Sequence, residues 1–156
     1  MARKQSDFVM YILKCLIGVA VGFYLYRKYP EIGVWCLISI VSVLSPDRKD
    51  AMKLALVRIE GNLVGAGIGL ALFFIHPMNL LMLSLGVTLT IITCSLLKLQ
   101  EVTRPAAVAV IIILLHQKGQ YFWDVALERA GGVLAGCLIA MMITYIFHEA
   151  ITKFKW

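Results

Sequence analysis

Long blocks of apolar residues dominate this chain and restrict its fold more than any other feature. Short joints rich in proline and charge separate six such blocks, at residues 8–26, 33–45, 61–75, 79–97, 105–116 and 131–147. Hydrophobic residues make up 61% of the 156 residues and charged residues 15%, whereas soluble domains hold about 45–50% and about 25%. We therefore expect one all-α integral membrane domain with six transmembrane helices.

Three of the blocks, 33–45, 61–75 and 105–116, are short for a bilayer. Their roughly 12 to 15 residues give about 18–23 Å of helix, against a hydrocarbon core of about 30 Å. The third and sixth helices should therefore begin earlier, near Ala51 and Tyr121. The first block resembles a signal peptide, but its length and the lack of a small-residue cleavage site favour a retained span.

An internal repeat occurs at an offset of 71 residues. Residues 55–65 (ALVRIEGNLVG) align with residues 126–136 (ALERAGGVLAG), and six of these eleven positions are identical. The same offset places the first block on the fourth and the second on the fifth. Each repeat unit, 8–76 and 79–148, therefore contains three spans. Because three is odd, the second unit enters the membrane upside down, as in the inverted repeats of transporters.

The distribution of basic residues predicts an orientation. With the N-terminus inside, ten lysines and arginines face the cytoplasm, against four outside (Arg27, Lys28, Lys118 and Arg129). This bias favours both termini in the cytoplasm. The net charge of +6 is explained by this bias, and we expect the lipid bilayer rather than nucleic acid as the partner of the basic residues.

Small residues recur every four positions in the third and sixth blocks, which lets helix backbones approach closely. These packing positions are Gly61, Gly65, Gly69, Gly132, Gly136 and Ala140. Arg58 and Arg129 each precede their stripe by three residues and share its face. We therefore expect both arginines to point into the protein, although snorkelling to the interface is the alternative.

A guanidinium group in an apolar wall attracts anions and can hold a carboxylate through two parallel hydrogen bonds. In inverted units, Arg58 would lie near the inner mouth of an anion path and Arg129 near the outer one. Lys14, inside the first span, is a third path candidate. Three carboxylates are weaker candidates for a proton carrier or counter-ion: Glu60, Asp124 and Glu128.

No pattern in the sequence indicates an enzyme, a metal site or a cofactor. The four cysteines lie inside apolar blocks without CxxC spacing and are read as small buried hydrophobic residues: Cys15, Cys36, Cys94 and Cys137. Paired carboxylates at catalytic spacing, nucleophile motifs and phosphate-binding loops are absent from the sequence.

The order of motifs resembles the fusaric acid resistance protein-like superfamily, which includes bacterial aromatic acid exporters and, more distantly, plant aluminium-activated malate transporters. The resemblance rests on Lys14, Pro30, Trp35, the pair Ser45-Pro46 and the two segments 55–65 and 123–136. In two respects the chain differs from the family pattern. Gly61-Asn62 stands where Gly-Thr is usual, and the sequence lacks the large cytoplasmic domain of longer members.

The resemblance implies a transporter or channel for organic anions, such as an exporter of aromatic or other weak-acid carboxylates. It implies a bacterial cytoplasmic (inner) membrane location, a homo-oligomer with a dimer favoured, and path roles for Lys14, Arg58 and Arg129. The competing interpretation is a small membrane scaffold or regulatory subunit without its own transport path. The glycine stripes would then serve helix packing alone.

Overall fold

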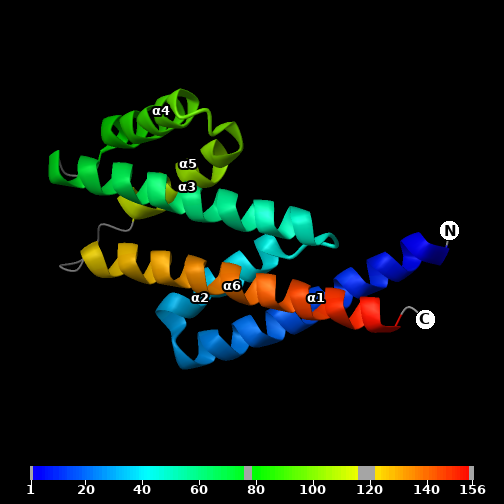
Figure 1. The fold of residues 1–156 in the computed structure, drawn as a ribbon. Coiled ribbons are helices and arrows are strands. Elements are labelled where there is room, and N and C mark those ends of the chain that lie inside the picture. Colours follow the sequence, from blue (N-terminus) through cyan, green and yellow to red (C-terminus); the bar gives the residue numbers. More distant parts are fainter. Residues whose placement is uncertain (1, 76–78, 116–121, 155–156) are drawn as a thin grey trace. The chain divides into compact units, whose positions relative to one another are not determined.

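The computed structural model describes residues 2–75, 79–115 and 122–154. Within these ranges the chain forms helices and no strand, in the order α1 (Ala2–Lys28), α2 (Pro30–Val43), α3 (Arg48–Ile75), α4 (Leu80–Leu96), the 3-10 helix η1 (Gln100–Val102), α5 (Thr103–Leu115) and α6 (Phe122–Phe154) (Figure 1). The all-helical prediction is confirmed.

Among the described residues, three helices are long and apolar enough to cross a membrane: Phe8–Lys28, Arg48–Ile75 and Asp124–Glu149. The prediction that the third and sixth helices begin before their glycine stripes is confirmed, because α3 starts at Arg48 and α6 by Phe122. Tyr121 and Lys118 lie outside the described residues. The helices α2 and α4 are also apolar but shorter.

Local sequence explains where the shorter helices begin and end. Pro30 is the first residue of α2, where its missing N–H is not needed. The side chain of Asn79 caps α4 by accepting a hydrogen bond of 2.8 Å from Met82 N. At the other end of α4, Lys98 adopts a left-handed conformation, and Leu99 N donates to Cys94 O at 2.8 Å. This pattern is a Schellman motif, which turns the chain sharply into η1.

The chain divides into two compact units. Unit 1 contains Met1–Leu56 and Gly131–Trp156, and unit 2 contains Val57–Ala130. In unit 1 α1 packs against α2, and in unit 2 α4 packs against α5. The helices α3 and α6 each contribute to both units. The glycine-rich part of α3 therefore belongs to the unit of α4 and α5, and that of α6 belongs to the unit of α1 and α2 (Figure 1).

In unit 2 the glycine stripe of α3 packs directly on α5. A methyl group added to Gly61 would lie 2.9 Å from Pro105 Cβ, and one added to Gly65 would lie 2.6 Å from the carbonyl oxygen of Ala106. A methyl group on Gly69 would lie 2.9 Å from Ile113 Cγ2. Only residues without a side chain allow this approach of the two helices.

In unit 1 the stripe of α6 makes the corresponding contacts with α2. A methyl group on Gly132 would lie 2.6 Å from Trp35 Cβ, and one on Gly136 would lie 2.6 Å from Ser39 Cβ. Ala140, the third member of this stripe, is fully buried. Trp35 precedes Ala106 by 71 residues, which is the offset of the sequence repeat. The small-residue stripes thus serve helix packing in both units.

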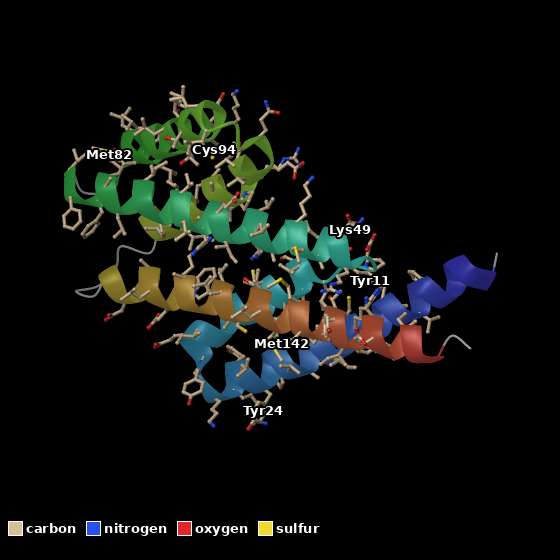
Figure 2. The ribbon with its side chains drawn as sticks, in the orientation of Figure 1. Tyr11, Tyr24, Lys49, Met82, Cys94 and Met142 are labelled. Atoms are coloured by element: carbon tan, nitrogen blue, oxygen red, sulfur yellow. The ribbon has the colours of Figure 1, made fainter. Side chains whose placement is uncertain are left out.

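Large apolar side chains cover much of the outer surface. Leu80 and Leu81 are each 78% exposed, and Tyr24 is 66% exposed and points away from the helices (Figure 2). In water this surface would be unfavourable, whereas in a bilayer lipid chains cover it. The exposure pattern therefore fits the membrane location predicted from the blocks.

Candidate functional site

Arg129 is buried within unit 2, with 6% of its surface exposed. It lies in the part of α6 that precedes the glycine stripe, and its Nε atom donates a hydrogen bond of 2.7 Å to Oδ1 of Asn62 on α3. Asn62 is likewise 6% exposed. Arg129 therefore points into the protein, as its helix face predicts.

The bond to Asn62 follows from the packing around it. Asn62 comes directly after Gly61, whose backbone lies against Pro105 and Ala106 of α5. A buried charge in apolar surroundings is tolerated only where polar groups replace its water. The Asn62 oxygen meets part of that need, and because it bonds Nε it also fixes the plane of the guanidinium group.

Arg58 is half-buried on α3 and belongs to the same unit as Arg129. Both arginines therefore lie on the helices that build unit 2. That Arg58 and Arg129 line opposite mouths of an anion path stays a prediction. Like charges kept close in an apolar environment raise the local affinity for an anion.

The three weaker candidates have different surroundings. Glu60 is half-buried and lines a cavity of about 370 Å³ in unit 2, together with Lys98, Gln100 and Glu101. Glu128 is half-buried and Asp124 is exposed at the beginning of α6. Their roles as proton carrier or counter-ion stay predictions.

Lys14 is 3% exposed and lies in unit 1. Its ammonium group donates to the carbonyl oxygens of Ser45 at 3.4 Å and Pro46 at 3.2 Å, just after the end of α2. The same side chain lines a cavity of about 340 Å³, whose polar wall also includes Tyr11, Asp47, Arg48 and His148. Lys14 thus ties α1 to the α2–α3 joint and also faces a polar space.

We expect Lys14→Met to lower the stability of the protein by about 1–3 kcal/mol, because two carbonyl groups lose a charged donor that methionine cannot replace. Thermal unfolding of the purified protein in detergent measures this change. Lys49→Met is the matched control, since Lys49 is exposed in the same joint. If Lys14→Met unfolds at the wild-type temperature, the two bonds contribute nothing to stability.

A protein-family model described as fusaric acid resistance protein-like matches residues 17–143. The chain belongs to this family. The match includes Arg58, Asn62 and Arg129, whereas Lys14 lies three residues before it. No curated protein and no solved structure matches the chain.

Membership of the fusaric acid resistance-like family supports a membrane location and a transport or resistance function. It is also consistent with a protein that is not an enzyme. Among the described residues, no group of three or more histidine, cysteine or carboxylate side chains is arranged to hold a metal ion.

Asn62 is the site residue that the sequence interpretation missed. It was noted only as a departure from the Gly-Thr usual in the fusaric acid resistance-like family, not as the partner of Arg129. A signal was present, because an amide within an apolar membrane helix needs a polar partner. The identity of that partner, 67 residues later, depends on the tertiary fold.

Proposed function

We propose that this protein is a transporter or channel for organic anions, working as a homo-oligomer, most simply a dimer, in the bacterial cytoplasmic membrane. The favoured substrates are aromatic or other weak-acid carboxylates, moved outward. The observation that supports this function best is the buried Arg129, held at Nε by Asn62, with the half-buried Arg58 in the same unit.

These residues can recognise a carboxylate by simple chemistry. A guanidinium group offers five N–H donors in a rigid fork, and Asn62 occupies one of those on Arg129. An arriving carboxylate would replace the protein groups that bind the arginines, rather than water molecules. Such an exchange lets the anion enter an apolar wall without losing all its hydrogen bonds, and it leaves binding weak enough for release.

The proposed path belongs to six spans arranged as two inverted three-helix repeats. Two observations support this arrangement: the glycine stripes of α3 and α6 make corresponding contacts, and equivalent contact residues on α2 and α5 are separated by the repeat offset. The helices α2 and α5 are of similar length, 14 and 13 residues. The beginning of α1 and the end of α6 lie on the same side of unit 1 (Figure 1), which supports placing both termini on one side of the membrane. The distribution of basic residues favours the cytoplasmic side.

Flux through reconstituted vesicles tests this function. We expect vesicles containing the protein to release preloaded benzoate faster than protein-free vesicles, whereas an uncharged analogue such as benzamide should leave both at equal rates. Vesicles with a membrane protein of similar size and no transport activity serve as the control. If no organic anion passes faster than it does through protein-free lipid, the scaffold or regulatory-subunit interpretation is favoured instead.

A further inference from the structure

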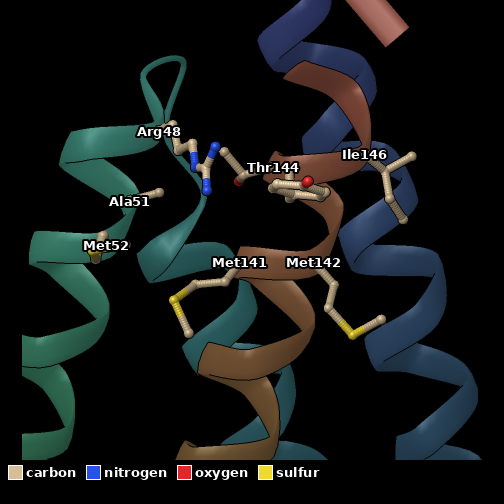
Figure 3. Close-up of a pocket in the computed structure, with 8 residues that line it drawn as sticks. Arg48, Ala51, Met52, Met141, Met142, Thr144 and Ile146 are labelled. Carbon is tan, nitrogen blue, oxygen red and sulfur yellow. The ribbon is translucent and has the colours of Figure 1, made fainter. Parts of the chain in front are cut away.

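Unit 1 contains a second pocket, which shares only Arg48 with the cavity that Lys14 lines. It has a volume of about 270 Å³ and lies between the start of α3 and the second half of α6. Arg48 and Thr144 lie at one end of it, and Met141 and Met142 lie toward the other (Figure 3). Polar groups thus occupy one end and flexible thioethers the other.

Thr144 differs from several other hydroxyl side chains of these helices. Ser42, Ser84, Thr88 and Thr90 each donate to the carbonyl oxygen four residues earlier. The hydroxyl of Thr144 is buried, with the residue 1% exposed, and makes no hydrogen bond to any described residue. A buried hydroxyl without a partner is costly, so turning the Thr144 side chain toward an acceptor oxygen of a ligand in the pocket would relieve that cost.

Arg48 supplies a positive charge at the same end of the pocket. Its guanidinium carbon lies 4.8 Å from the centre of the Tyr145 ring, a cation–π contact that holds the side chain over α6. The neighbouring charges are mixed, because Asp47 and Asp50 accompany Lys49 in the joint. Arg48 is the charged residue among those that line the pocket.

The polar end of the pocket lies at the depth of lipid headgroups, and its apolar end lies at the depth of acyl chains. Arg48 is the first residue of its span, and Thr144 lies five residues before the end of the other at Glu149, which is about 7 Å along a helix. Met141 lies about 12 Å from that end and therefore deeper. Met142, 63% exposed, and Tyr145, 48% exposed, open the pocket toward the lipid-facing surface.

We propose that this pocket binds an anionic phospholipid. Arg48 and Thr144 hold the phosphate at headgroup depth, and the methionines contact the upper part of an acyl chain. Thioether side chains suit this role because they are flexible and adapt to irregular apolar shapes. The predicted excess of basic residues on this side of the membrane is the pattern that accompanies an anionic leaflet.

The test compares lipid binding to purified, delipidated protein by native mass spectrometry and by thermal unfolding. The probes are phosphatidylglycerol and phosphatidylcholine with identical acyl chains. We expect phosphatidylglycerol to bind more tightly and to raise the unfolding temperature more. Arg48→Gln should weaken its binding roughly fivefold, and Thr144→Val roughly five- to tenfold. Lys49→Gln, the matched control, should bind as the wild type does.

Thr144→Val keeps the proposal testable if Arg48→Gln folds poorly. Valine has the shape of threonine without the hydroxyl, so the lipid-free variant should unfold at the same or a higher temperature while losing affinity for phosphatidylglycerol. The proposal fails if the two lipids bind equally, if Thr144→Val binds phosphatidylglycerol normally, or if Lys49→Gln is as defective as Arg48→Gln. Displacement of the lipid by benzoate would also overturn it and assign the pocket to the transported anion. A loss of dimers in Arg48→Gln without lipid selectivity would assign it to a second copy of the chain.

Discussion

Replacing Arg129 with alanine is expected to reduce benzoate flux in reconstituted vesicles by roughly ten- to a hundredfold, while the protein still inserts and elutes as a single species. The estimate follows from the loss of hydrogen bonds to a charged group, each contributing about 1.5–3 kcal/mol. The flux of Arg129→Lys should fall between those of the wild type and Arg129→Ala. Lysine keeps the charge but lacks the planar fork that holds a carboxylate at two points.

Two comparisons separate this role from a general effect of removing an arginine. Arg104→Ala makes the same change at an exposed position in unit 2 and should leave flux unchanged. Asn62→Ala should lower flux less than Arg129→Ala and add little to it in the double variant, because Asn62 acts by orienting Arg129. Equal flux in the wild type and Arg129→Ala would remove Arg129 from the transport mechanism.

The largest effects on stability are expected from adding a methyl group where the glycine stripes contact backbone. In Gly136→Ala the new methyl would lie 2.5 Å from the carbonyl oxygen of Cys36, and in Gly65→Ala it would lie 2.6 Å from that of Ala106. Backbone atoms within helices cannot move aside as a side chain can, so each pair of helices must separate. We expect each variant to lose about 1–3 kcal/mol of stability.

Each stripe has a matched control on its own helix. No atom lies within 4 Å of a methyl group added to Gly67 or Gly131, so Gly67→Ala and Gly131→Ala should be neutral or slightly stabilising through helix propensity. Thermal unfolding in detergent, followed by circular dichroism, measures all four variants. If Gly65→Ala and Gly136→Ala unfold at the same temperatures as their controls, the close approach of α3 to α5 and of α6 to α2 does not stabilise the protein.

Much of the architecture could be predicted from local sequence. Apolar block length predicted helices and a membrane location, and the predicted earlier starts of α3 and α6 are confirmed. The spacing of the small residues identified the packing faces, and it also indicated that Arg129 points inward. These features depend on helical periodicity and on the thickness of a bilayer, which act over a few residues or along one helix.

The pairing of distant segments could not be predicted in the same way. In a membrane protein, apolar residues face lipid as readily as they face other helices, so hydrophobicity does not reveal which stripe meets which helix. Only the fold determined that the α3 stripe packs on α5 and the α6 stripe on α2. It likewise determined that Asn62 bonds Arg129 and that Lys14 bonds the chain after α2. The sequence by itself determined the helices and their packing faces; the tertiary structure decided their partners, because those contacts join residues that are far apart along the chain.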